Sequence, residues 1–365
     1  MKKMIVNFIL TVFIFNISLA QTKSSFVVKK ITNYIYIAHP QKINRVNNTS
    51  TIILGPDYLT VVESQTDEFM ATELLKAIRS KISRLPIKYL INTHFHLDHV
   101  LGTKTFVNEN PGIIIITHEL TAKIMEQKAK TDKGQFVAAL MQKSISTRKL
   151  TEQEKIKKKK SELFTAANDI EKYSKDLSAS TIVFPTLTFS DSLNIWNNRL
   201  HIELKFLGGG HTPGDIVVLI PEEKFLITGD LVHDYEPLFW DANIDNWLLS
   251  LEKIKTLDFD NFVGGHGDVH KGKEVIDFWK EYLEEVRTKT IKAIAEGMSL
   301  IDFQKSLSLE SFASLQRNDY GKRIQHFRST FMGDVMTGPL LEAIKSQLGF
   351  VWNFYQKGRS ESSYK

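Results

Sequence analysis

The feature that most constrains this chain is a short segment in which four of six residues can bind a metal ion. Residues 93–99 read Thr-His-Phe-His-Leu-Asp-His, so the potential ligands are His94, His96, Asp98 and His99. Side chains two positions apart share one face of an extended chain but point in nearly opposite directions on a helix. His94 and His96 therefore require a strand end or a loop. We expect Asp98 to continue this alternation, and Asp98 and His99 to serve a second, nearby centre.

Three later segments follow a common pattern, in which a short apolar strand runs into glycine and then into His or Asp. The residues reached in this way are His211, Asp230 and His266. The expected strands cover residues 202–207, 225–228 and 261–263. Glycine permits sharp turns and close backbone approach, so each strand end can direct a ligand into a shared cleft. If the strands lie side by side, all seven candidate ligands meet at one edge.

The composition limits the chemistry of any bound metal. The chain has no cysteine, which excludes disulfides, thiolate nucleophiles and all metal sites built on cysteine sulfur. A metal must therefore be held by nitrogen and oxygen. With 47 Lys and Arg against 42 Asp and Glu, the formal net charge is +5 over 365 residues. This balance does not indicate a nucleic-acid binder, so we expect a small-molecule substrate and no nucleic-acid partner.

The first 20 residues have the pattern of a secretory signal peptide. Lys2 and Lys3 precede an apolar run over residues 4–17, and small residues follow, so cleavage is expected between Ala20 and Gln21. An uncleaved membrane anchor is the alternative, but the run is shorter than the ~20 apolar residues that a spanning helix needs. We expect an exported protein, periplasmic or secreted, with no membrane contact in its mature form.

The remaining chain passes from strands to helices, back to strands, and ends in helices. Short apolar runs predict strands up to residue 117 and again after residue 180, whereas a Lys- and Glu-rich stretch between them predicts two or three amphipathic helices. This order indicates an α+β fold of two sheets covered by helices on both outer sides. The expected parts are a main domain at 21–285, a helical insertion at about 119–176 and a C-terminal helical extension at 286–365.

With these motifs in this order, the sequence resembles the metallo-β-lactamase superfamily over residues 26–270. The resemblance implies a four-layer αβ/βα sandwich with two metals at one edge of the sheets. It further implies that the first metal is held by His94, His96 and His211, the second by Asp98, His99 and His266, and that Asp230 bridges both. Residues 185–229 and 239–243 look most like exported hydrolases associated with quinoprotein or sulfur-oxidation systems.

The departures from the family pattern bear on the metal. Relatives that place Cys at the second metal are excluded, and iron-binding relatives usually replace the second His of the first motif by Glu, whereas His96 is present here. We therefore expect two Zn²⁺ per chain, although an all-nitrogen and oxygen site also suits iron or manganese. Two metals roughly 3.5–4 Å apart can hold a bridging hydroxide that attacks an acyl centre. Asp98 is expected to orient this hydroxide, as the one residue with a catalytic role.

These features predict an exported dinuclear hydrolase of a small ester, thioester, lactone or amide. A His-liganded metallo-β-lactamase is the alternative enzyme, and a metal-binding protein without turnover is a further alternative. Neither the substrate nor the oligomeric state follows from the sequence. Among the other polar residues, Asp215 is expected to hydrogen-bond within its turn and His118 to be structural, while His233 and Tyr235 fit the cleft and a surface loop equally well.

Overall fold

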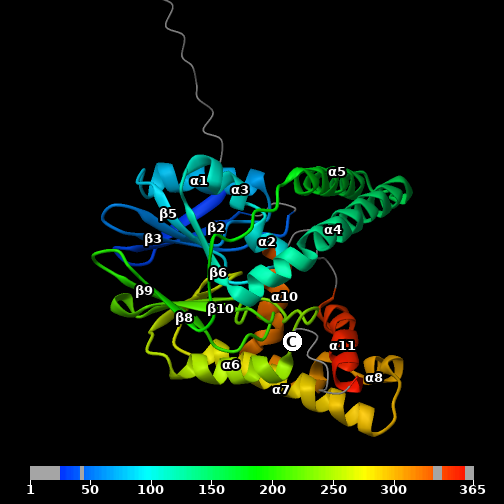
Figure 1. The fold of residues 1–365 in the computed structure, drawn as a ribbon. Helices are drawn as coiled ribbons and strands as arrows, with labels where there is room; N and C mark the ends of the chain where they lie inside the picture. Colours follow the sequence, from blue (N-terminus) through cyan, green and yellow to red (C-terminus); the bar gives the residue numbers. More distant parts are fainter. Residues whose placement is uncertain (1–24, 42–44, 332–338, 358–365) are drawn as a thin grey trace, which may run out of the picture.

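The computed structural model describes residues 25–41, 45–331 and 339–357. The predicted signal peptide and its cleavage site lie outside these residues. Two mixed β-sheets are stacked face to face, and helices cover the outer side of each sheet (Figure 1). The expected four-layer arrangement is confirmed. Within the described ranges, no helix combines the length and the apolar character that crossing a membrane requires.

The first sheet contains seven strands in chain order. They are β1 (Phe26–Lys30), β2 (Ile35–Pro40), β3 (Ser50–Leu54), β4 (Leu59–Val62), β5 (Ile87–Ile91), β6 (Ile114–His118) and β7 (Leu187–Phe189). Strands β1 to β4 pair antiparallel, whereas β4 to β7 pair in parallel. Because parallel strands share one direction, the carboxyl ends of β4, β5 and β6 meet at the same edge of the sheet.

The second sheet contains six strands in the order β13-β12-β11-β10-β9-β8. They are β8 (Ser192–Trp196), β9 (His201–Phe206), β10 (Ile216–Ile220), β11 (Phe225–Gly229), β12 (Asn261–Gly264) and β13 (Val269–Lys271). Strands β11 and β12 are parallel and the other pairs are antiparallel. It follows that β9, β11 and β12 run in one direction and end at one edge.

The core has three layers of apolar packing. Between the sheets, aliphatic side chains such as Ile37, Ile116, Ile202 and Val218 are fully buried against one another. Helices α1 (Glu68–Lys81) and α3 (Thr103–Glu109) cover the outer face of the first sheet. Helices α6 (Ile244–Thr256) and α7 (Glu274–Ala295) cover the second sheet. The central strands β4, β10 and β11 are buried throughout and read as nearly continuous apolar runs, whereas β8 and β9 alternate in burial.

The predicted helical insertion consists of two helices between β6 and β7. Helix α4 (Glu119–Gln153) begins directly at the end of β6, and α5 (Lys157–Ala179) packs along it. In Figure 1 the pair projects from the side of the sandwich. Arg45 ties α5 to the body, because its guanidinium binds both Asp176 of α5 and Asp67, the residue that caps α1. The insertion is therefore anchored by a buried ion-pair cluster.

The expected boundary between residues 285 and 286 falls inside α7, so the C-terminal extension is continuous with the main domain at this point. Buried residues lie on both sides of the boundary, including Leu283 and Val286. Trp352 of the last helix belongs to the same apolar cluster as α7. The elements after α7 are α8 (Leu300–Ser306), η2 (Leu309–Ser311), α9 (Ala313–Gln316), η3 (Arg317–Asp319), α10 (Tyr320–Phe331) and α11 (Leu340–Gln356); a single turn, η1 (Pro221–Glu223), joins β10 to β11.

Replacing Asp67 by alanine tests the role of the buried ion-pair cluster. Asp67 is fully buried, accepts a hydrogen bond of 2.7 Å from the Met70 amide and pairs with Arg45. Asp67→Ala removes the cap of α1 and one of the two carboxylates that bind the buried Arg45, while Asp176 still pairs with Arg45, so we expect the free energy of unfolding to fall by ~2–5 kcal/mol. Urea denaturation measures the change. Asp57→Ala in an exposed turn is the control, expected within ~0.5 kcal/mol of wild type. A loss below ~1 kcal/mol for Asp67→Ala would contradict this account.

Candidate metal centre

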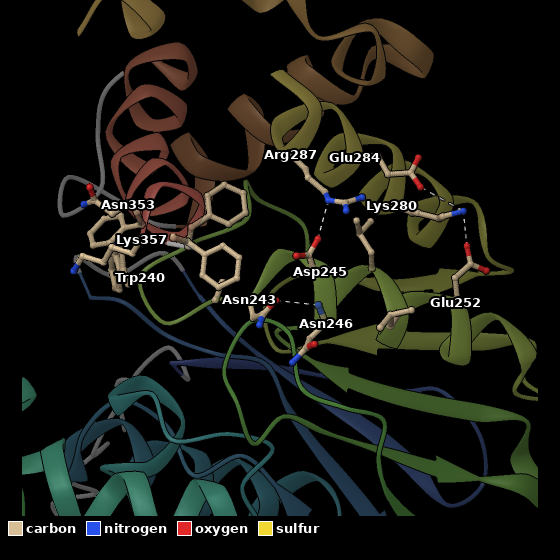
Figure 2. A pocket seen from close by; sticks show the side chains of 16 residues that line it. Trp240, Asn243, Asp245, Asn246, Glu252, Lys280, Glu284, Arg287, Asn353 and Lys357 are labelled. Atoms are coloured by element: carbon tan, nitrogen blue, oxygen red, sulfur yellow. Dashed lines mark hydrogen bonds and ion pairs between the residues drawn. The ribbon is translucent and has the colours of Figure 1, made fainter. Parts of the chain in front are cut away.

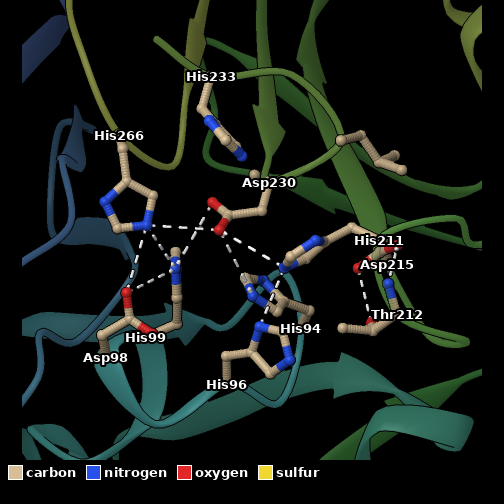
Figure 3. A network of polar contacts seen from close by, with 12 residues as sticks. His94, His96, Asp98, His99, His211, Thr212, Asp215, Asp230, His233 and His266 are labelled. Atoms are coloured by element: carbon tan, nitrogen blue, oxygen red, sulfur yellow. Dashed lines mark hydrogen bonds and ion pairs between the residues drawn. The ribbon is translucent and has the colours of Figure 1, made fainter. Parts of the chain in front are cut away.

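Five of the seven predicted ligands lie just beyond the carboxyl end of a strand. His94 and His96 follow β5, His211 follows β9, Asp230 follows β11 and His266 follows β12. These strands end at one common edge of the two sheets, so residues up to 172 positions apart in the sequence converge there (Figure 3). Side chains that follow the ends of neighbouring strands thus come together as expected, a relation that we call the strand-end rule.

Asp98 and His99 reach the same place by a different route. They lie in a short helix, α2 (Leu97–Val100), so the expectation that Asp98 continues an extended alternation is wrong. Hydrogen bonds from other parts of the chain hold this turn: Ser64 donates to the His99 carbonyl, with an Oγ–O distance of 2.8 Å, and Asn48 donates to the Asp98 carbonyl at 2.8 Å. The turn places the two side chains beside His266, whose Nε2 is 3.2 Å from Asp98 Oδ2 and 3.3 Å from His99 Nε2.

The ligands form two compact groups. In the first, His94, His96 and His211 each place one nitrogen within 4.8 Å of the others. In the second, a carboxylate oxygen of Asp98 and one nitrogen each of His99 and His266 lie equally close. Within the first group, His211 Nε2 lies 2.9 Å from His96 Nδ1. Ligand atoms around a tetrahedral zinc ion are roughly 3.3 Å apart, as follows from bonds of ~2.0–2.1 Å. Both groups are therefore close to the size of one metal site.

Asp230 lies between the two groups and contacts both. Its Oδ2 is 3.6 Å from His211 Nε2 and 3.9 Å from His94 Nε2 in the first group. The same oxygen is 3.4 Å from His266 Nε2, and Oδ1 is 3.6 Å from His99 Nε2 in the second group. One carboxylate thus lies within 3.9 Å of two histidines of each group, which is the placement that a bridging ligand requires.

The burial of these groups provides a test of whether they fit a metal. His94 Nε2 and Asp230 Oδ1 are buried and have no hydrogen-bond partner among the described residues. A buried polar atom without a partner is costly, and both atoms face the centre of the cluster (Figure 3). A metal ion would satisfy them. The nitrogen and oxygen donors present suit zinc, and they also suit iron or manganese.

Several residues bind the ring nitrogen that faces away from the cluster. The contacts are Thr93 Oγ1 to His94 Nδ1 at 3.1 Å, Asp241 Oδ2 to His96 Nε2 at 3.1 Å, Glu63 Oε2 to His99 Nδ1 at 3.3 Å and the Asn47 carbonyl to His266 Nδ1 at 2.8 Å. Partners of this kind fix the orientation of a metal-binding imidazole. Sequence reasoning missed them. Glu63 follows β4 at the same edge, so the strand-end rule could have found it, whereas Asp241 lies in a loop and gave no such signal.

The two groups differ in the charge of their histidines. Burial and the neighbouring His96 lower the pKa of His211 to about 3. Burial, with His99 nearby, also lowers the pKa of His94 well below its usual value. In the second group burial is outweighed by the carboxylates: Asp230 and Asp98 raise the pKa of His266 to about 9. Without metal, His266 therefore carries a proton at neutral pH and His211 does not.

The other polar residues considered from the sequence have separate roles. Asp215 accepts hydrogen bonds from the Thr212 amide and hydroxyl at 2.8 and 2.6 Å, within its own turn as expected. His118 caps α4 and lies stacked on a Phe ring, which is a structural role. His233 is buried and lies near Asp230 in Figure 3, so it is not on a surface loop. Tyr235 is buried and lines a cavity that also borders His96, Asp98 and Asp230.

The family model of the metallo-beta-lactamase superfamily matches residues 43–192 and 197–266, which is more than half of the chain. The chain belongs to the metallo-beta-lactamase superfamily. The matched residues include all seven of the converging ligands.

Two curated relatives illustrate the range within the superfamily. The linear primary-alkylsulfatase of Pseudomonas sp. is 24% identical over 305 residues, which cover 77% of this chain and 54% of the relative. The metallo-beta-lactamase type 2 of Bacteroides fragilis is 31% identical over 115 residues, which cover 30% of this chain and 45% of the relative. The chain thus spans about half the length of the curated relatives that it matches.

Solved structures show the same fold. A metallo-beta-lactamase from Pontibacter korlensis superposes with a TM-score of 0.52 at 19% identity and covers 71% of this chain and 99% of its own. The metallo-beta-lactamase FIM-1 from Pseudomonas aeruginosa gives a TM-score of 0.51 at 14% identity, with 71% and 95% covered. At these identities the likeness concerns the fold alone.

Gly265 offers a test of the Asp230 position. A methyl group at this residue would overlap Asp230 Oδ1 and lie 2.9 Å from His99 Cε1. Gly265→Ala should therefore displace Asp230 and weaken metal binding by at least ~10-fold. Competition with a chromogenic chelator measures the affinity, and circular dichroism checks the fold. Gly134→Ala on α4, where the added methyl meets nothing within 4 Å, is the matched control. Equal affinities in the two variants would refute the close-approach argument.

The pKa difference between the groups predicts that their metal affinities respond differently to pH. At pH 7 a metal must displace the proton of His266, and this cost disappears as the pH rises through about 9. Affinity at the second group should therefore rise by at least roughly tenfold per pH unit between 7 and 9, since His99 of this group also binds its proton more tightly than usual. His94 and His211 carry no proton in that range, so the first group should respond far less. Zinc competition titrations at several pH values separate the two steps; equal pH slopes would contradict the assignment.

Proposed function

We propose that this protein is an exported, dinuclear metal-dependent hydrolase, most simply with two Zn²⁺, that cleaves a small ester, thioester, lactone or amide. The observation that carries the proposal is the pair of ligand groups joined by Asp230. Beside them lies a cavity of about 440 Å³, large enough for a small-molecule substrate, whose lining includes His96, Asp98 and Asp230. We also propose that nucleic acid is not a partner.

A second, larger cavity does not fit this function. It measures about 940 Å³ and lies among α6, α7 and α11 (Figure 2). None of the seven ligands lines it, and most of its charged residues are paired with one another, as in Arg287 with Asp245 and Lys280 with Glu252. Among the residues that the structure describes, only Trp240 borders both cavities. We therefore place the substrate in the smaller cavity.

The residues of the site divide the work of hydrolysis. Bound metal ions would supply an ionised water at neutral pH and positive charge for the oxygen that develops negative charge. Asp230 sets the separation of the two ligand groups, because it contacts both. Asp98 is more exposed than Asp230, with 16% of its side chain accessible against 3%, and faces the cavity. Its carboxylate can therefore hold and orient a water molecule beside the substrate.

The relatives define the alternatives to be tested. The likeness to a Bacteroides fragilis metallo-beta-lactamase supports a His-liganded β-lactamase as the second candidate. The likeness to an alkylsulfatase adds sulfate esters to the bonds worth testing. A non-catalytic metal-binding protein would hold metal without turning over any of these substrates. A panel of carboxylic esters, lactones, thioesters, β-lactams and alkyl sulfates distinguishes the candidates.

Replacing Asp230 tests the dinuclear assignment. The metal-loaded protein should contain about two metals per chain and lose activity to chelators. Asp230→Ala should reduce occupancy of at least one metal and lower kcat by at least ~100-fold on the best substrate of the panel, because nothing then sets the separation of the groups. Elemental analysis and steady-state kinetics measure both effects.

Asp215→Ala is the control for this experiment. Asp215 is equally buried but binds only Thr212 within its turn, so its loss should cost less than the ~100-fold limit for residues that support ligands. An Asp230→Ala protein that keeps two metals and near-normal turnover would overturn the proposed bridge. A wild-type protein that binds no metal under metal-replete conditions would overturn the proposed function.

A further inference from the structure

The cavity beside the ligand groups is enclosed by segments that are distant in the sequence. One wall is the first ligand motif, the second is the loop that follows β11, and the third is a single face of α4 in the insertion. The residues of α4 that line the cavity are Lys128, Asp132, Gln135, Phe136 and Ala139. Their spacing of three and four positions is that of one helical face. The insertion therefore contributes directly to the substrate site.

The lining is apolar over most of its area. The apolar and aromatic members are Val46, Phe95, Leu97, Phe136, Ala139, Tyr235, Leu238 and Trp240. Phe95 and Leu238 are buried, while Trp240 is half exposed at the rim. A pocket of this kind gains free energy by removing apolar substrate surface from water. It fits a hydrocarbon chain or ring better than a strongly hydrated group.

Among the described residues of this lining, Lys128 is the one cation, and two carboxylates already share it. Lys128 Nζ lies 2.6 Å from Asp241 Oδ1 and 3.3 Å from Asp132 Oδ2. The other Asp241 oxygen is bonded to His96. Apart from the metal ligands, the lining thus carries one positive and two negative charges. No unpaired cation remains among these residues to receive an anionic group of the substrate.

The arrangement penalises an additional negative charge near α4. A carboxylate or sulfate that enters this part of the cavity would lose its hydration and lie close to Asp132 and Asp241. Lys128 is already paired with both of these carboxylates and does not offset the new charge. Two negative charges that lie close together repel strongly in a site of low dielectric constant. An uncharged chain meets no such penalty and gains from the apolar lining.

We infer that this cavity accepts an uncharged, apolar acyl group and rejects one that ends in an anionic group, with Asp132 as a residue that determines this specificity. The inference rests on the proposed function, since it concerns the substrate of the same hydrolytic site. It narrows the proposed substrates to neutral, hydrophobic esters, lactones, thioesters or amides. The insertion, rather than the metal ligands, would then determine which acyl groups the site accepts.

A matched pair of esters tests this inference on the metal-loaded protein. The first is 4-nitrophenyl hexanoate, and the second is mono-4-nitrophenyl adipate, which carries a carboxylate at the end of a chain of equal carbon number. We expect kcat/KM to favour the hexanoate by at least ~10-fold. Asp132→Asn should reduce this preference by at least ~3-fold. Glu126→Gln makes the same change of charge on an exposed part of α4 outside the cavity, and it should leave the preference unaltered.

The outcomes separate failure of the inference from failure of the proposed function. Hydrolysis of both esters with equal or greater kcat/KM for the adipate, in wild type and Asp132→Asn alike, would overturn the inference and leave the hydrolase in place. If neither ester is hydrolysed, calorimetric binding of octanamide and of suberic acid monoamide decides. Tighter binding of octanamide, by at least ~10-fold and less in Asp132→Asn, supports the inference. Equal binding that Asp132→Asn does not alter would overturn it.

Discussion

Burial of three carboxylates at one edge of the sheets is the constraint on which this structure depends. Glu63 and Asp230 are almost fully buried, and Asp98 is partly buried, with 16% of its side chain accessible. A carboxylate in such a position requires positive charge or several hydrogen bonds close by. The surrounding histidines meet this need in part, because His99 and His266 bind protons more tightly than usual. Metal ions would meet it fully. The histidines that converge here therefore also supply positive charge that the buried carboxylates require.

Ion pairs extend from this centre into the insertion. His96 contacts Asp241, and Asp241 binds Lys128 of α4. At the other end of the insertion, Arg45 binds Asp176 of α5. These contacts fix the α4 wall of the cavity relative to the first ligand group. The shape of the cavity and the placement of the first ligand group are therefore linked through Asp241, which contacts both His96 and Lys128.

Sequence reasoning succeeded where the chemistry is local. All seven converging ligands stand next to a recognisable strand end or in the first motif. It failed where distant segments decide the structure. Helix α2 has four residues and is held by Ser64 and Asn48, some 35 and 50 positions away. No local pattern encodes such a turn. Asp241 was missed for the same reason, because only the fold brings it to His96.

The position of the insertion in the sheet has a consequence for how this architecture can diversify. Strand β6 is parallel to β5, so the chain leaves β6 at the edge where the ligands of β5 also lie. A segment of any sequence grafted after His118 would begin beside the metal ligands. The hairpin between β3 and β4 turns at the opposite edge, because β4 ends near the ligands and therefore begins away from them. Exchange of this one segment can thus change which molecules the cavity binds, while the ligand residues on the other strands stay the same.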